Sequence, residues 1–186
     1  YSEIEKRNWK VGIITCSASR IDKERELTNL NNLEVELFKE AIISTEVQDF
    51  YGEIYLDACD INEKRFGDRV SSSLGKDWSQ WTIQSKHKMD FDNILVGAAS
   101  ILAKFHRDKE IEKIGQVLNL DIGSGYPSDP KTRVAIEELI KGNTPNIHLR
   151  WSWATIENMW LKEKKKPIPK RSEIERNSVQ SSISDW

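Results

Sequence analysis

Apolar and polar residues alternate along the chain with two different periods, which predicts strands that alternate with helices. Apolar, largely β-branched residues from Trp9 to Thr15 predict a buried strand, and the run from Ile54 to Asp57 predicts a short one that ends in a carboxylate. A third strand is predicted from Trp81 to Ser85. Apolar residues at helical spacing predict a helix from Asn29 to Ile43 whose apolar face packs on the sheet. This alternation is typical of an α/β domain.

The second half of the chain has a mainly helical pattern. The strongest helical pattern runs from Asn93 to Leu118, with small apolar residues first and charged residues later, so we expect the first part to be buried and the second solvated. Asp129 followed by Pro130 is typical of a helix start, because the carboxylate caps the first turn and proline fits its first position. The other predicted helices cover Glu63–Ser71, the residues up to about Lys141, and Trp151–Lys162.

The composition changes after Lys162. Lysines, prolines and serines replace the apolar residues there, and such a segment buries too little apolar surface to fold alone. We therefore predict one domain over residues 1–162, with C-terminal helices, and a disordered tail over residues 163–186.

The charge of the chain gives a mild argument against nucleic-acid binding. The formal net charge is −2 and the pI is about 6.0, whereas non-specific nucleic-acid binders are usually basic. Local clusters leave a basic face possible, and they are Lys86 to Lys88, Lys104 to Arg107, and Lys131 with Arg133.

Cysteine and apolar content predict the compartment. Cys16 and Cys59 stand far apart and lack zinc-type spacing, which favours reduced thiols. The apolar stretches are shorter than the roughly 20 residues of a membrane span. We expect a soluble, cytoplasmic monomer.

Two carboxylates have a context that favours metal chemistry. Asp57 ends a predicted strand, and Asp90 follows a basic cluster just before the long helix. Carboxylates in this position are typical of Mg²⁺ or Mn²⁺ sites for phosphoryl transfer, because hard divalent ions prefer oxygen ligands. The alternative is structural: Asp57 caps a turn and Asp90 caps the following helix.

Several blocks of sequence resemble archaeal-type ribonuclease HII, in the order that the family has them. Together they span roughly residues 9 to 160, which makes the resemblance far more specific than any single motif. The blocks are Asp57–Phe66, His87–Asp90, Ala98–Lys104, Arg107–Asp108, Gly123–Thr132 and Arg150–Trp153.

The resemblance implies a fold and an activity. The fold is a ribonuclease H-like mixed sheet flanked by helices, with a helical C-terminal extension. The activity is endonucleolytic cleavage of RNA in RNA–DNA hybrids, and on the 5′ side of ribonucleotides embedded in DNA, by four carboxylates that hold two divalent ions. Asp57 matches the third of these carboxylates and Asp90 the fourth.

The resemblance also implies substrate-binding residues. Tyr126 matches a tyrosine that stacks on the sugar at the RNA–DNA junction, with a turn tyrosine packed on the core as the alternative. Lys88, Lys104 and Arg107 could contact phosphate or neutralise the carboxylates, and solvated surface charge is the alternative for each.

The chain departs from the family pattern in one respect. The Asp-Glu pair and the Gly-Arg-Gly loop, which the family carries upstream, occur nowhere in these 186 residues. We therefore expect this chain alone to be inactive and to need an upstream segment. The alternative is a non-catalytic, split or degenerate module that binds RNA–DNA hybrids and is tethered to the sliding clamp.

The C-terminal end resembles the short peptide by which replication proteins bind the sliding clamp. Gln180, Ile183 and Trp186 have the spacing that presents an aliphatic and an aromatic side chain on one side of a helical turn. The usual peptide ends in two aromatic residues and this one has a single aromatic, so an accidental match is the alternative.

Overall fold

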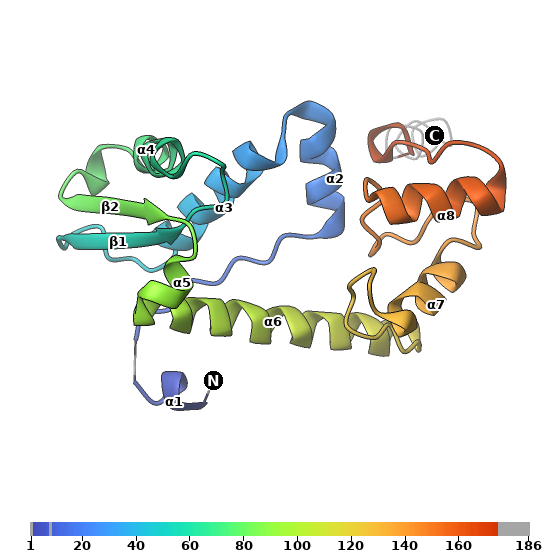
Figure 1. The fold of residues 1–186 in the computed structure, drawn as a ribbon, viewed down its shortest axis with the longest axis horizontal. Helices are drawn as coiled ribbons and strands as arrows, with labels where there is room; N and C mark the ends of the chain where they lie inside the picture. The colour runs from blue at the N-terminus through green and yellow to red at the C-terminus, as the bar shows by residue number, and fades with distance from the viewer. Residues whose placement is uncertain (1, 8, 175–186) are drawn as a thin grey trace, which may run out of the picture. The chain divides into compact units, whose positions relative to one another are not determined.

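The computed structural model describes residues 2–7 and 9–174, and their contacts form two compact units (Figure 1). The first unit takes its described residues from Tyr1–Thr15 and Leu30–Arg107, and the second takes them from Cys16–Asn29 and Asp108–Trp186. Helix α6 (Ile94–Leu118) contributes to both.

A two-stranded parallel sheet lies in the first unit. Strand β1 (Gly52–Asp57) pairs with β2 (Trp81–Lys86) in a register that matches Gly52 to Trp81 and Asp57 to Lys86. Parallel strands need a crossover, which here contains helix α4 (Glu63–Leu74) and a 3₁₀ turn, η1 (Lys76–Trp78). The α/β class predicted from the sequence is therefore confirmed.

One face of this sheet forms the core of the first unit. Alternate residues of each strand point to the same side, and Leu56 on that side packs with Phe66 and Val70 of α4. Helix α3 (Leu30–Ile43) adds Val35 and Phe38, and the Phe38 and Phe66 rings meet edge to face at 5.2 Å. The helices that the sequence predicts over 29–43 and 63–71 are thus present, the second one turn longer.

The opposite face of the sheet is polar. Glu53 accepts hydrogen bonds from the Gln84 amide nitrogen and the Tyr55 hydroxyl, both at 2.6 Å. Because side chains alternate along a strand, Asp57 points to this same face, away from the apolar core.

The prediction of a strand from Trp9 to Thr15 is wrong for the described part of the chain. Residues 9–15 are irregular, and Trp9, Val11 and Ile13 are 45%, 46% and 39% exposed. The pattern has the β-branched content of a strand, but no described segment pairs with it, and a strand requires a ladder partner.

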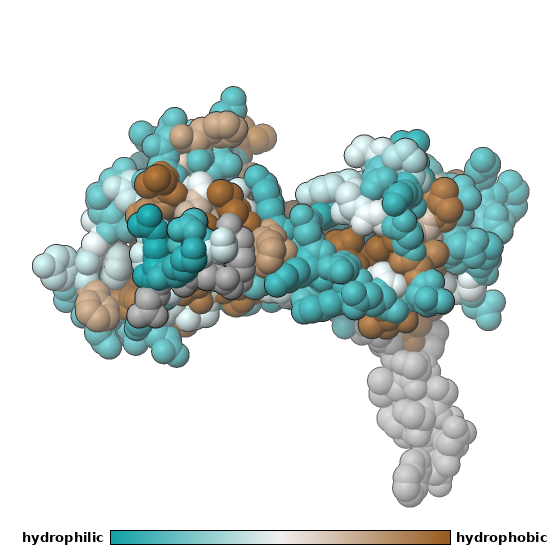
Figure 2. Space-filling model, turned by 90° about the horizontal axis from the view of Figure 1, so that it is seen from below, coloured by the Kyte–Doolittle hydropathy of each residue, from teal (hydrophilic) through white to brown (hydrophobic). Residues whose placement is uncertain are grey.

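The expected burial of the first part of α6 is also wrong. No residue of α6 is buried, and Ile94, Leu95 and Ile101 are exposed. Small apolar residues favour burial only where another element packs on them, and the described residues supply none that buries this face. Figure 2 shows hydrophobic residues exposed among hydrophilic ones on the face that it draws.

The second unit is helical. It contains α2 (Ala18–Leu27), α7 (Pro130–Leu139) and α8 (Ala154–Lys164), and its core consists of Ile136, Ile140, Ile156 and Trp160. Asp129 caps α7 as predicted, accepting the backbone N–H of Lys131. The first described element, α1 (Ser2–Glu5), is a single turn at the start of the chain.

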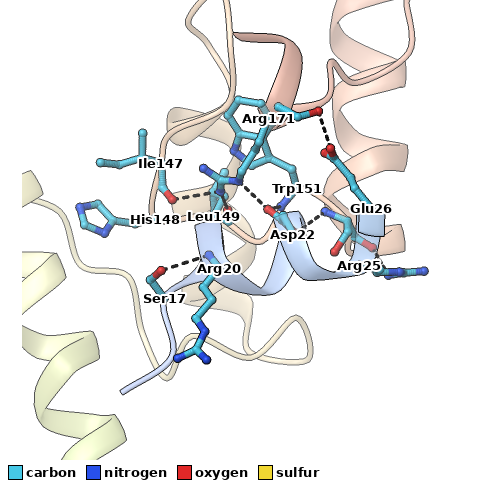
Figure 3. A network of polar contacts seen from close by, with 12 residues as sticks. Ser17, Arg20, Asp22, Arg25, Glu26, Ile147, His148, Leu149, Trp151 and Arg171 are labelled. Atoms are coloured by element: carbon cyan, nitrogen blue, oxygen red, sulfur yellow. Dashed lines mark hydrogen bonds and ion pairs between the residues drawn. The ribbon is translucent and has the colours of Figure 1, made fainter. Parts of the chain in front are cut away.

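The segment after α8 packs against the second unit up to Ile174. Arg171 is only 4% exposed, and its Nε donates to Asp22 of α2 at 2.7 Å (Figure 3). The remaining part of the predicted tail, 175–186, lies outside the described residues. No helix in the described part of the chain has the length and apolar content needed to cross a membrane.

Candidate active site at the strand ends

The two parallel strands end at the same edge of the sheet, and both predicted metal-binding residues lie there. Asp57 ends β1 opposite Lys86, which ends β2. The chain then turns through His87 and Lys88 into the short helix α5 (Met89–Asp92), which contains Asp90. Ligands of α/β proteins bind at the carboxyl ends of strands, so this edge is where such a site is expected.

Hydrogen bonds join the segments that follow the two strands, and we call residues 57–63 and 86–90 the strand-end junction. The backbone N–H of Ala58 donates to the Lys86 carbonyl at 2.9 Å. The N–H of Met89 donates to Oδ1 of Asp57 at 3.1 Å. Asp57 is thereby linked directly to the residue before Asp90.

His87 makes further contacts across the strand-end junction. Its backbone N–H donates to Oε1 of Glu63 at 2.7 Å, and its ring Nε2 lies 2.7 Å from the Asp60 carbonyl oxygen. Lys88 follows in a left-handed conformation with φ 57° and ψ 30°. Such a conformation is uncommon for a residue other than glycine, and strained backbone of this kind clusters at functional sites.

The side chain of Asp60 stabilises the turn after β1. Its buried carboxylate accepts hydrogen bonds from the Arg65 guanidinium and, at 3.2 Å, from the Asn62 N–H. These contacts, that of Arg65 above all, lower the pKa of Asp60 to about 2. The negative charge of Asp60 is thus committed to this turn.

Asp57 contacts the segment that carries Asp90, through the N–H group of Met89. Asp57 and Asp90 are both half-buried. The alternative role of Asp57 is present as well, because Asp57 accepts the first N–H of α5. That of Asp90 is not, since Asn93 accepts the N–H groups of Leu95 and Val96 at the start of α6.

Gly97 fixes how closely α6 approaches Asp90. A Cβ atom at this position would lie 2.9 Å from the Asp90 carbonyl oxygen. Only glycine permits this approach without a shift of the backbone. Gly97 therefore allows α6 to pack closely against the backbone of Asp90.

The predicted basic residues take different positions. Lys88 is exposed within the strand-end junction. Lys104 and Arg107 lie on α6, about 15 and 20 Å along the helix from its first residue at a rise of 1.5 Å per residue.

Tyr126 belongs to the second unit, in a loop that the start of α7 holds in place. Oδ2 of Asp129 accepts the Ser124 N–H at 2.6 Å, and the Asp129 N–H donates to the Tyr126 carbonyl at 2.9 Å. The pKa of Asp129 is lowered, chiefly by the hydrogen bond from the Ser124 N–H. The Tyr126 side chain is 50% exposed, so its ring can be reached from solvent.

His87 is the residue that the sequence analysis missed. The sequence places it in a basic cluster, but its contacts are with residues 24 and 27 positions away. The nearest sequence signal is its place between a strand and a carboxylate. The residues proposed for clamp binding, Gln180, Ile183 and Trp186, lie outside the described residues.

A divalent cation suits the chemistry of the strand-end junction but needs more ligands than the junction supplies. Asp57 and Asp90 offer oxygen atoms, which hard cations prefer. Within 2–7 and 9–174, however, no three or more His, Cys, Asp or Glu side chains form a group that could hold a metal ion. Two carboxylates from this part of the chain therefore form an incomplete site.

Comparisons with known proteins place the chain among its relatives. The family model described as Ribonuclease HII matches residues 3–156. The chain is 42% identical to the ribonuclease HII of Thermococcus sibiricus over 149 residues, which are 79% of this chain and 62% of that protein. It is 38% identical to the ribonuclease HII of Methanococcus maripaludis over 152 residues, which are 81% of this chain and 62% of that protein.

Solved structures show the same likeness. The crystal structure of ribonuclease H2 from Pyrococcus horikoshii matches with a TM-score of 0.69 and 33% identity, over 82% of this chain and 69% of that one. The ribonuclease HII in a complex with PCNA from Archaeoglobus fulgidus matches with a TM-score of 0.63 and 28% identity, over 75% and 64% of the two chains. The chain thus spans about three fifths of the length of the relatives first compared, and it belongs to the ribonuclease HII family.

Proposed function

We propose that this protein is an endoribonuclease that cleaves the RNA strand of RNA–DNA hybrids and duplex DNA at embedded ribonucleotides. One observation carries the proposal: Asp57 and Asp90 lie in one hydrogen-bonded junction at the ends of two parallel strands. Membership in the ribonuclease HII family supports it.

Each predicted site residue has a role in this proposal. Asp57 and Asp90 would hold Mg²⁺ or Mn²⁺, and such ions activate water and stabilise charge on a phosphate under attack. Lys88, Lys104 and Arg107 bind backbone phosphates, and phosphate contacts fix the position of a duplex on a protein. Tyr126 stacks on the sugar at the RNA–DNA junction.

The 186 residues on their own are proposed to be inactive. Hydrolysis with two metal ions needs both ions about 4 Å apart, which takes more ligands than Asp57 and Asp90 provide. The Asp-Glu pair that the family uses is not among these residues. An upstream segment would supply the remaining carboxylates.

The protein is also proposed to act in the cytoplasm as a monomer and to bind the sliding clamp. Gln180, Ile183 and Trp186 would form the docking peptide. The structure of an archaeal ribonuclease HII in complex with PCNA supports this partner.

Cleavage assays on three matched duplexes test the proposed activity. Protein expressed from the complete reading frame is incubated with an RNA–DNA hybrid, a DNA duplex with one ribonucleotide and an all-DNA duplex. We expect cleavage of the first two only, and a loss of at least about 1,000-fold in Asp57→Asn, as for removal of a group that acts in the transition state. Asp68→Asn is the control, because this exposed residue pairs with Lys64 on α4.

Two results would contradict the proposal. One is equal cleavage of all three duplexes, and the other is wild-type cleavage by Asp57→Asn. The same assay on the 186-residue chain tests the need for further carboxylates, and the expected result there is no cleavage.

A further inference from the structure

The imidazole of His87 joins the segments that carry the two candidate metal-binding carboxylates. Resting on the function proposed above, we propose that His87 is a positioning residue that sets the spacing of Asp57 and Asp90 for the cation. Its Nε2 lies 2.7 Å from the Asp60 carbonyl oxygen, and its Nδ1 lies 3.2 Å from Oε1 of Glu63. Both partners belong to the turn that follows Asp57.

The His87 ring bridges to this turn through a hydrogen bond. A carbonyl oxygen only accepts hydrogen bonds, so Nε2 is the donor to Asp60. The Asp60 carboxylate is itself bound by Arg65, so the turn that carries this carbonyl has a second contact. The imidazole therefore links the segment before Asp90 to a point three residues after Asp57.

The backbone around His87 supports the same role. Lys88 lies between His87 and Met89 and adopts the left-handed conformation. The chain therefore changes direction between the two residues that contact the 57–60 segment. The Met89 N–H then reaches Asp57 itself at 3.1 Å. The two contacts on either side of the strained residue hold both ends of the 57–60 segment.

Loss of the imidazole should loosen this junction without unfolding the protein. The His87 side chain is 45% exposed, so little apolar burial depends on it. The N–H groups of Ala58 and Met89 donate to the Lys86 carbonyl and the Asp57 carboxylate, and neither hydrogen bond involves the ring. A positioning role thus predicts weaker metal binding at nearly unchanged stability.

The test measures Mn²⁺ affinity by electron paramagnetic resonance of protein from the complete reading frame, with no substrate present. We expect His87→Ala to bind Mn²⁺ at least about tenfold more weakly, as for other groups that orient metal ligands. His87→Gln should recover most of the affinity, because its amide can donate to the Asp60 carbonyl. His148→Ala is the control, since this exposed histidine lies in the second unit.

Wild-type affinity in both His87 variants would overturn the positioning role, and so would equal loss in the alanine and glutamine variants. If His87→Ala does not fold, His87→Ser, which also lacks the ring, replaces it: a loss of about tenfold or more there, with at most about threefold in His87→Gln, supports the role, and any other result overturns it. Cleavage of the hybrid by the wild type tests the proposed function separately. A wild-type protein that binds Mn²⁺ but cleaves no hybrid would contradict that function. The Mn²⁺ affinities of the His87 variants would still test the positioning role.

Discussion

At the scale of single residues, Asp60 shows how an ion pair shapes the candidate site. Its carboxylate is bound by Arg65 and by the Asn62 N–H, so the folded protein favours the charged form. The pKa falls from 3.8 to about 2. A group with a lowered pKa stabilises the fold above its unfolded value, and this stability is lost as the pH falls through the folded value.

The free energy of unfolding should therefore fall between about pH 4 and pH 2 partly through Asp60. Urea unfolding at several pH values measures this, with Asp60→Asn as the comparison. We expect the variant to be less stable near pH 7 and to have a flatter acid limb. Parallel acid limbs in both proteins would show that Asp60 is not responsible.

The loop of Tyr126 depends on a glycine at Gly123. Its φ is +61°, and an added Cβ would lie 2.5 Å from Oδ2 of Asp129, the cap of α7. Gly75 has a φ of +80° but nothing within 4 Å of an added Cβ. These two glycines therefore separate backbone strain from steric clash.

We expect Gly75→Ala to cost about 1–3 kcal/mol of unfolding free energy from backbone strain alone, because its φ of 80° and ψ of −169° lie in a region that essentially only glycine adopts. Gly123→Ala should cost at least about 1 kcal/mol more, because the clash also disturbs the helix cap. Urea unfolding of both variants measures the difference. Equal losses would mean that the Asp129 contact does not hold the loop.

The sequence predicts the strand that ends at Asp57 and the long helix that follows Asp90, but it does not predict the contacts of the residues around these two carboxylates. Asp57 and Asp90 each stand at the boundary of an element, which local patterns reveal. The contacts of His87 join residues more than 20 positions apart, so they arise only when the two strands pair.

At the scale of elements, local periodicity predicts five helices and the two paired strands, but not α2. Helices α3, α4, α6, α7 and α8 form where apolar spacing and caps indicate them. The segment from Trp9 to Thr15 fails because a strand depends on a partner, whereas a helix satisfies its own backbone.

A buried ion pair joins α2 to the segment after α8 in the second unit. Asp22 accepts the N–H groups of Trp151 and Ser152 at 2.8 and 3.0 Å, besides Nε of Arg171. The Arg171 guanidinium lies 4.3 Å from the centre of the Trp151 ring (Figure 3). No local sequence signal reveals this network, because Asp22 and Arg171 are 149 positions apart.

Asp22→Ala should destabilise the second unit by about 3–5 kcal/mol, because it leaves Arg171 buried without its charge partner. Leu27→Ala on the same helix is the control, since Leu27 is 82% exposed, and its expected change is within about 0.5 kcal/mol. Urea unfolding followed by tryptophan fluorescence measures both. A loss below about 1 kcal/mol for Asp22→Ala would contradict a stabilising role.

At the scale of the whole molecule, blocks of sequence in the order that the family has them identify the family. The overall charge, by contrast, argues mildly against nucleic-acid binding. A net charge of −2 says nothing of where the basic side chains gather. Family membership adds the expectation of a clamp partner, which rests on the last residues of the chain.

Trp186→Ala should abolish binding to the sliding clamp while leaving hybrid cleavage unchanged, because the peptide serves docking alone. Calorimetric titration with the clamp measures the binding. Ser182→Ala is the matched control within the same peptide. Unchanged binding by Trp186→Ala would show that the match is accidental.

The most direct measurement is anomalous diffraction from a crystal of the protein, expressed from its complete reading frame and soaked in Mn²⁺. If Asp57 and Asp90 bind the cation, a manganese peak lies about 2.1–2.3 Å from carboxylate oxygens of both residues. If the crystal binds Mn²⁺ elsewhere but no manganese ion contacts both carboxylates, the proposed metal site is contradicted.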